Sequence, residues 1–323
     1  MSLSLLIENL TNPALLFFIL GLLAVAVKSD LEIPANSSKF ISLYLLFAIG
    51  FKGGHELTHE TFDSQTLATI AFGIGSSLII PVLTFMLLRK KLGVFNAGAI
   101  AAAYGSVSAV TFVTAVNYLE TQQIPVHGHM VAVMALMESP AIIMGLLLIS
   151  IFNKSEEGKI KKSHAIKHSF TNGSVWLILG SLIIGFIANE KQAQGIEPFT
   201  NDIFKGFLAI FLLDMGITSG RKIKALISNG PVPFLFALLT PLIIGCIAAC
   251  LTGFITSDIG DRLLLSILAA SASYIAVPAA MKMAVPQANP GLYLPMALAI
   301  TFPVNITLGM PLYFSIIQMG NFA

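Results

Sequence analysis

The sequence predicts an all-α polytopic membrane protein with ten transmembrane helices in two inverted five-helix repeats. Three observations support this. Of the 323 residues, 56% are hydrophobic and 11% are charged, whereas soluble domains carry about 25% charged residues. Apolar segments long enough to cross a bilayer recur along the chain. Two of these segments contain similar short motifs, 165 residues apart.

The apolar segments form two sets of five around one polar stretch. In chain order, the expected spans are 12–28, 38–54, 65–88, 96–117, 126–152, 171–189, 203–220, 231–256, 262–282 and 291–318. The predicted domains are a first five-helix repeat (1–152), a lysine-rich linker (153–170) and a second repeat (171–323). Because five is odd, the second repeat enters the membrane from the opposite side, and the repeats are inverted.

The basic residues are distributed unevenly between the two sides of the membrane. Fourteen of the 18 lysines and arginines follow spans one, three, five, seven and nine, and four lie on the opposite side. The positive-inside rule places the richer side in the cytoplasm. Both termini are therefore expected outside, and the linker 153–170 is expected to be cytoplasmic.

Small and hydroxyl-bearing residues interrupt the fourth and ninth spans, which we expect to cross at the midplane. The fourth reads Gly105-Ser106-Val107-Ser108, and the ninth reads Ala270-Ser271-Ala272-Ser273. Helices that restart at such breaks offer free amides and positive dipole ends, which hold an anion without a basic side chain. The repetition favours a substrate site there. The alternative is that these serines only form hydrogen bonds between packed helices. A second pair of similar sequences, residues 46–54 and 212–220, also occurs once in each repeat.

Two carboxylates fall inside predicted spans, where a charge costs at least about 2.5 kcal/mol. Glu138 precedes a kink at Pro140, where carbonyls freed from the helix could join the carboxylate around Na⁺. Asp214 is the second candidate for a cation or a proton. The alternative for such an acid is a protonated form, hydrogen-bonded to a neighbouring helix.

His55-Glu56-Leu57-Thr58-His59 matches H-E-x-x-H, in which two histidines one helical turn apart bind zinc. His127 and His129, predicted on the same outer side, offer a third ligand. The motif follows two glycines and runs into polar residues, so we expect it in a loop. A membrane zinc metallopeptidase using His55, Glu56 and His59 is kept as an alternative, but no metal site is expected.

Other activities find no support in the sequence. It contains no phosphate-binding glycine loop, no nucleophile elbow and no nucleic-acid-binding module. We therefore expect no enzyme activity, no organic cofactor and no nucleic-acid partner. Without an ATP-driven domain, any transport has to be coupled to an ion gradient, depend on partners or be passive.

Several motifs resemble the sodium-dependent bicarbonate transporter family of cyanobacteria. In order, they are Ile33-Pro34, Ile49-Gly50 with Gly53-Gly54, 104–111, 119–125, Pro140-Ala141 and 285–293, and they span nearly the whole chain. The resemblance implies a homotrimer in the bacterial inner membrane, an elevator-like motion, and Na⁺ and bicarbonate sites at the crossing of the broken helices. The family's long cytoplasmic loop is much shorter here, which leaves a cytoplasmic PII-like regulator as an open question.

The resemblance also implies site residues. Carried over by motif, the anion and sodium site consists of Gly105, Ser106, Ser108, Thr111, Ser271 and Ser273. Among these, Ser108 and Ser273 are assigned to both substrate and cation.

This chain departs from the family's pattern in both breaks. In the ninth span, Tyr274 replaces an acid, Ala276 a serine and Val277 a glycine; in the fourth, Val110 replaces a serine. Tyr274 offers its phenol as a donor to the substrate, and Glu138 or Asp214 could supply the missing charge.

The predicted function is Na⁺-coupled uptake of bicarbonate or a related small anion across the lipid bilayer. The altered site leaves a larger or less polar anion open as the substrate. The competing hypotheses are a membrane sensor or scaffold of the same fold that transports nothing, and the zinc peptidase.

Overall fold

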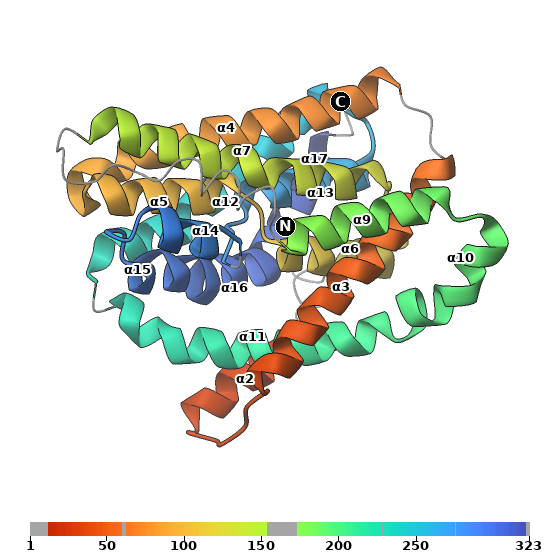
Figure 1. Ribbon diagram of the computed structural model, residues 1–323, viewed down its shortest axis with the longest axis horizontal. Helices are drawn as coiled ribbons and strands as arrows, with labels where there is room; N and C mark the ends of the chain where they lie inside the picture. The colour runs from red at the N-terminus through yellow and green to blue at the C-terminus, as the bar shows by residue number, and fades with distance from the viewer. Residues whose placement is uncertain (1–11, 60–62, 154–172, 228, 275, 321–323) are drawn as a thin grey trace.

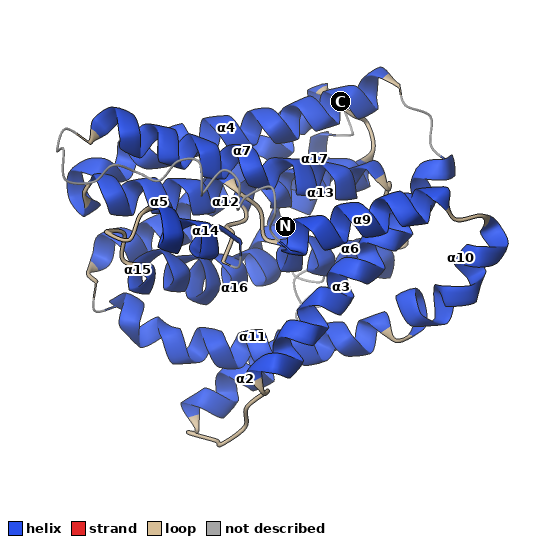
Figure 2. Ribbon diagram, viewed as in Figure 1, coloured by secondary structure: helices blue, strands red, loops and turns tan. Residues whose placement is uncertain are grey.

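The computed structural model describes residues 12–59, 63–153, 173–227, 229–274 and 276–320. These residues are predominantly helical and include no strand (Figures 1 and 2). Nearly all of the predicted linker, 153–170, lies outside the described residues.

The helices follow the predicted segments in order. The first repeat contains α2 (Pro13–Ala26), α3 (Ala35–Glu56), α4 (Ser64–Leu92), α5 (Val94–Gly105), α6 (Ala109–Thr121) and α7 (His129–Phe152). The second contains α9 (Gly173–Ile187), α10 (Glu190–Glu197), α11 (Phe204–Ile227), α12 (Pro231–Leu251), α13 (Ile259–Ala270), α14 (Ala276–Ala284), α15 (Pro290–Pro295), α16 (Phe302–Val304) and α17 (Met310–Gly320).

Local sequence explains several helix ends. The side chains of Asn12 and Asp63 each accept a backbone hydrogen bond of 2.9 Å in the first turns of α2 and α4, which satisfies a free amide at the helix start. Gly93 (φ 80°) separates α4 from α5, and Gly230 (φ 89°) precedes α12. Both occupy the left-handed region that favours glycine.

Six helical stretches among the described residues are long and apolar enough to cross a bilayer: 64–92, 94–121, 129–152, 190–223, 231–254 and 290–320. Two shorter helices, 13–26 and 176–187, are also apolar. The predicted spans 38–54 and 262–282 are not among the six; α3, which covers the first of them, contains Lys39 and Lys52. The count of ten spans therefore stays a prediction.

The helices form two groups, which we call the frame (α2, α3 and α9–α11) and the bundle (α4–α7 and α12–α17). In the frame, α2 packs along α11, and α3 packs along α9. In the bundle, α4, α5 and α7 pack on one another, and α12, α13 and α17 do the same. Figure 1 shows α11 running along the lower edge of the bundle, where α2 crosses it.

Glycines allow the frame helices to cross closely. A Cβ atom on Gly216 of α11 would lie 2.1 Å from the carbonyl oxygen of Phe18 in α2. One on Gly54 of α3 would lie 1.9 Å from the carbonyl oxygen of Leu182 in α9. Only glycine permits backbones to approach this closely. Both glycines belong to the echoed motifs 46–54 and 212–220.

Two regions differ from the prediction. α3 continues through His55 and Glu56, which were expected in a loop. α10 and a π-helical turn (Pro198–Asp202) occupy the segment between the sixth and seventh predicted spans. A capping box starts α10, because Asn189 and Gln192 exchange two hydrogen bonds of 3.0 Å. The helix is polar, so a search for apolar runs misses it.

Candidate functional site

The two interrupted spans break at equivalent positions. α5 and α13 each contain 12 residues. The residues that follow them have nearly the same conformation, with φ −84° and ψ 178° at Ser106 and φ −82° and ψ 170° at Ser271. We call residues 106–108 the first break, and the segment from Ser271 to the start of α14 the second break.

The two breaks are in direct contact. The amide of Ser108 donates a 3.0 Å hydrogen bond to Oγ of Ser271. The amide of Ser273 donates a 2.8 Å hydrogen bond to the carbonyl oxygen of Ala103, near the end of α5. Buried backbone groups need such partners once they leave a helix. Each break therefore provides hydrogen-bond partners for polar groups of the other.

A serine side chain precedes each restarted helix. Ser108 is the N-cap of α6, and its Oγ accepts a 3.2 Å hydrogen bond from the amide of Thr111. Oγ of Ser273 accepts a longer one, 3.4 Å, from the amide of Val277 in α14. Each serine uses one acceptor site and keeps its hydroxyl proton for another partner.

A cavity of about 40 Å³ lies where the breaks meet, which we call the break cavity. Such a volume admits water or a small ion. Its polar lining comes from Ser42, Ser108, Glu138, Ser273 and Tyr274. The other lining residues are apolar, and the described lining includes no lysine, arginine or histidine. Any anion here would depend on helix N-termini and hydroxyl groups.

A larger cavity of about 470 Å³, which we call the vestibule, adjoins the break cavity. Ser42 and Tyr274 line both cavities. The vestibule also contains Lys39, Arg221 and Lys222, from the side predicted to be cytoplasmic. Tyr274 thus lies at the boundary between the candidate site and the wider opening.

The two carboxylates predicted to bind the cation lie in different cavities. Glu138 on α7 lines the break cavity, and its carboxylate has no hydrogen bond or ion pair with any residue that the structure describes. Asp214 on α11 lines the vestibule and accepts a short hydrogen bond from the hydroxyl of Ser38. The structure therefore brings Glu138, but not Asp214, to the break cavity.

The remaining candidates surround the cavity without lining it. Gly105 packs against α4, where a Cβ atom would lie 2.1 Å from Cγ of Pro81. Ser106 is buried, and its Oγ has no hydrogen-bond partner among the described residues. Ser271 accepts from Ser108 and donates to the carbonyl of Leu268 at 2.9 Å. The amide of Thr111 is taken by the Ser108 cap.

The departures from the family's pattern lie close to the site. Val110 lines the break cavity, so a methyl group faces space that a hydroxyl would occupy in the family's pattern. The ring of Tyr274 packs edge-on against Phe302, with centroids 5.9 Å apart. Its hydroxyl is buried without a hydrogen-bond partner among the described residues. Val277 is fully buried.

Several residues at the site are not among the predicted substrate-binding or cation-binding residues. Ser42 of α3 belongs to the frame, and no motif surrounds it. Asn305 supports the second break, because its Nδ2 donates a 2.8 Å hydrogen bond to the carbonyl oxygen of Ala270. The hydroxyls of Tyr104 and Thr301 lie 2.7 Å apart and anchor α5 to the last span. Isolated polar residues in apolar segments are the only signal that could have found them.

The H-E-x-x-H motif does not form one helical face. α3 ends at Glu56, and Leu57–His59 form a separate 3₁₀ turn. Nε2 of His55 lies 3.2 Å from Oε2 of Glu190 on α10. The described side chains thus pair His55 with a carboxylate of another helix.

The comparison with protein families is consistent with this geometry. A model of the Na⁺-dependent bicarbonate transporter superfamily matches residues 13–318. The chain belongs to this superfamily. The match covers nearly the whole chain and confirms the resemblance drawn from the motifs. The superfamily comprises transporters rather than enzymes, which removes the metallopeptidase hypothesis. No curated protein matches the chain.

Proposed function

We propose that this member of the Na⁺-dependent bicarbonate transporter superfamily is a secondary active transporter. It takes up bicarbonate or a related small anion together with Na⁺. The observation that carries the proposal is the pair of interlocked helix breaks around a cavity that contains hydroxyls and a carboxylate but no described basic side chain. Such a site suits an anion held by helix N-termini with a cation nearby.

The anion contacts the restarted helices. Ser108 and Ser273 donate their hydroxyl protons, and the first amides of α6 add to them. Tyr274 provides a further hydroxyl at the cavity boundary. Gly105, Thr111 and Ser271 hold the backbone of the breaks in place rather than touching the anion, and Ser106 lies buried beside them.

Na⁺ binds on the Glu138 side of the cavity. An unpaired carboxylate at this depth is costly unless a proton or a cation compensates it. Ser108 and Ser273 line the same cavity, so their hydroxyl oxygens can coordinate the ion together with Glu138. Asp214 acts from the vestibule, where its charge attracts the cation on its way in or out.

Helix packing supports ten spans in two inverted repeats. In the frame, the first span (α2) packs on the seventh (α11), and the second (α3) packs on the sixth (α9). If the first span is equivalent to the sixth and the second to the seventh, these two pairs are equivalent to each other. The trios α4–α5–α7 and α12–α13–α17 correspond in the same way. Pseudo-two-fold symmetry of this kind is typical of secondary transporters.

The cavities suggest how access alternates. On the side predicted to face outward, Nζ of Lys52 in the frame lies 2.6 Å from Oε1 of Glu120 in the bundle. Lys205 of the frame approaches the same carboxylate at 3.8 Å. A cavity of about 730 Å³ lies beside these ion pairs, but it shares no lining residue with the break cavity. On the other side, the vestibule reaches Tyr274. We propose an inward-facing state, from which the bundle moves against the frame in an elevator-like manner.

Some features are proposed from the family resemblance alone. They are a homotrimer and a location in the bacterial inner membrane. The orientation, with termini outside and the linker 153–170 in the cytoplasm, is proposed from the distribution of basic residues. A cytoplasmic regulator of the PII type stays an open question.

Uptake into proteoliposomes tests the proposal. We expect labelled bicarbonate to accumulate only with an inward Na⁺ gradient, and K⁺ in place of Na⁺ is the control. A folded, inserted protein that binds anions but accumulates none of a panel would instead be a sensor of the same fold.

A further inference from the structure

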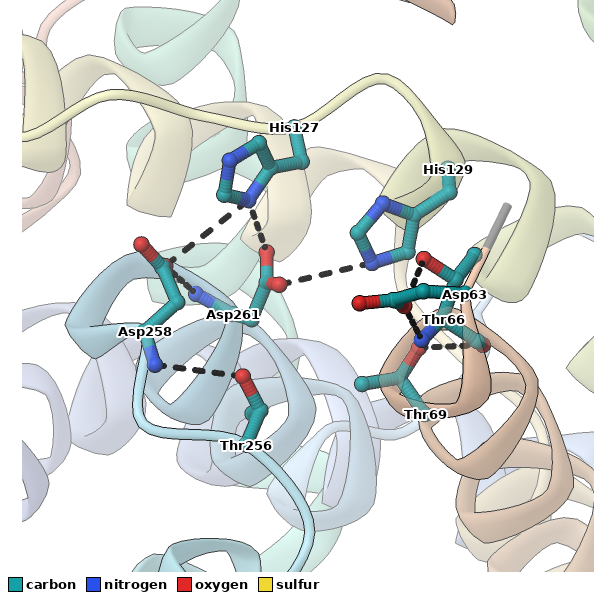
Figure 3. Close-up of polar contacts among 8 residues, drawn as sticks. All are labelled: Asp63, Thr66, Thr69, His127, His129, Thr256, Asp258 and Asp261. Carbon is teal, nitrogen blue, oxygen red and sulfur yellow. Dashed lines mark hydrogen bonds and ion pairs between the residues drawn. The ribbon is translucent and has the colours of Figure 1, made fainter. Parts of the chain in front are cut away.

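Two histidines and an aspartate gather where α7 and α13 begin (Figure 3). Nδ1 of His127 lies 3.1 Å from Oδ1 of Asp261, and Nε2 of His129 lies 3.4 Å from Oδ2 of the same carboxylate. One ligand atom from each residue lies within 4.8 Å of the other two. The imidazole rings are stacked, with centroids 5.6 Å apart.

Close backbone packing positions this cluster. A Cβ atom on Gly128, between the two histidines, would lie 2.0 Å from the carbonyl oxygen of Gly53 in α3. One on Gly260 would lie 2.6 Å from the carbonyl oxygen of Pro125. Asp258 caps α13 by accepting a 2.8 Å hydrogen bond from the amide of Asp261. Neither the histidine segment nor the start of α13 has room to shift far.

The spacing suits a tetrahedral metal ion. Tetrahedral ligands about 2.0–2.2 Å from Zn²⁺ lie roughly 3.3–3.6 Å from one another. The three ligand atoms already lie within 4.8 Å of one another, so a modest contraction brings them to that spacing. Imidazole nitrogens favour zinc and its neighbours in the first transition series over Na⁺, Mg²⁺ or Ca²⁺. Oδ1 of Asp258, 3.9 Å from Nδ1 of His127, is available as a fourth ligand, and water is the alternative.

The surroundings allow an ion to enter. The side chain of His127 is 36% exposed, whereas His129 and Asp261 are nearly buried. The cluster faces a cavity of about 440 Å³ that also contains Glu56, Asp63 and Asp258. These carboxylates attract cations to a site that is open on one side.

We propose that His127, His129 and Asp261 bind a transition-metal ion of the Zn²⁺ class on the side of the protein predicted to face outward. The ion joins the first repeat to the second, because the histidines precede or begin α7 and the aspartate lies in the first turn of α13. α7 carries Glu138, and α13 leads to Ser271. The metal therefore holds together two helices that contribute to the transport site, without touching the substrate.

Zinc binding to the purified full-length chain, free of a histidine tag and stripped with chelator, tests this proposal. We expect one Zn²⁺ per chain by titration calorimetry and elemental analysis, and a higher melting temperature with the metal. His127→Ala, at the exposed position, and His129→Ala should each weaken binding at least tenfold. Co²⁺ should give the visible absorption of a tetrahedral complex, and this absorption should disappear in both variants.

His55→Ala is the matched control, because Nε2 of His55 also lies near a carboxylate, 3.2 Å from Oε2 of Glu190, on the same predicted side of the protein. It should leave the stoichiometry and affinity unchanged. Zinc binding that is absent in the wild type would overturn the proposal and leave only imidazole–carboxylate hydrogen bonds. Binding that survives in folded His127→Ala and His129→Ala variants, or disappears in His55→Ala, would overturn it as well.

Discussion

In the first break the chain leaves the helix for three residues, and Ser108 caps the next helix at 3.2 Å. In the second break the interruption is longer, and the Ser273 contact is weaker at 3.4 Å. The backbone at Ser106 and Ser271 is nearly identical, but their hydroxyls differ. Oγ of Ser271 has two partners, whereas Oγ of Ser106 has none among the described residues.

The comparison separates two kinds of recognition. Backbone hydrogen bonds between the breaks depend little on side-chain identity, so an anion held by amides and helix dipoles tolerates sequence change. An ion held by side-chain ligands does not tolerate such changes, because each replacement removes a ligand. The replacements at Tyr274, Ala276 and Val277 all fall in or next to the second break, so we expect cation binding to differ most there from the family's pattern. Four predictions test this contrast, in order of decreasing effect.

Removing either cavity-facing serine should affect transport most strongly. Ser108→Ala and Ser273→Ala each delete a hydrogen bond to a charged ligand, worth about 1.5–3 kcal/mol. Initial uptake of the transported anion at subsaturating concentration should fall at least tenfold in either variant. Ser266→Ala is the control, because Oγ of Ser266 is buried in the same span and donates only to the carbonyl of Arg262. Normal uptake by both break variants would refute the site.

The equivalent serines should differ in their effect on stability. Ser271→Ala leaves the amide of Ser108 without its acceptor and should lower the free energy of unfolding by about 1–3 kcal/mol. Ser106→Ala removes a hydroxyl that has no described partner and should be nearly neutral. Thermal melts of the two variants in detergent measure the difference. Equal shifts would mean that the breaks are not held together in this way.

Restoring the family's acid should strengthen sodium coupling. Tyr274→Asp adds a carboxylate at the edge of the break cavity, and its attraction for a cation should lower the half-saturating Na⁺ concentration roughly tenfold. Tyr274→Phe keeps the ring and the size, so it controls for loss of the phenol. If Tyr274→Asp left the Na⁺ dependence unchanged, the cation would not bind near the second break.

The smallest effect is expected at Val110. Val110→Ser returns a hydroxyl to the cavity wall and should add about 0.5–1.5 kcal/mol of anion binding, a gain of roughly two- to tenfold in apparent affinity. Val110→Thr is the matched variant, because it keeps the branched shape and adds only the hydroxyl. Anion concentration curves would show the gain, and weaker binding in both variants would mean that the anion does not contact residue 110.

Much of this organisation can be predicted from the sequence because it depends on local composition. Apolar segments indicate most of the bundle helices, and the recurring serines indicate both breaks. The contribution of Ser42 to the break cavity is not predictable from the sequence. Ser42 belongs to the frame, and it lies near the breaks only in the folded protein. Likewise, His127 and His129 are conspicuous in the sequence, but their partner Asp261 lies more than 130 residues away. α10 was missed because it is polar, although its capping residues Asn189 and Gln192 are a recognisable signal.

Substrate protection of single cysteines tests most directly whether the two breaks form one site. Ser108→Cys and Ser273→Cys would be made separately after replacement of the native Cys246 and Cys250, and labelled with a small thiol reagent in proteoliposomes. We predict that the transported anion with Na⁺ slows labelling at both positions, and that neither is protected by the anion with K⁺. Protection at only one position, or at neither, would contradict a site shared by the two breaks.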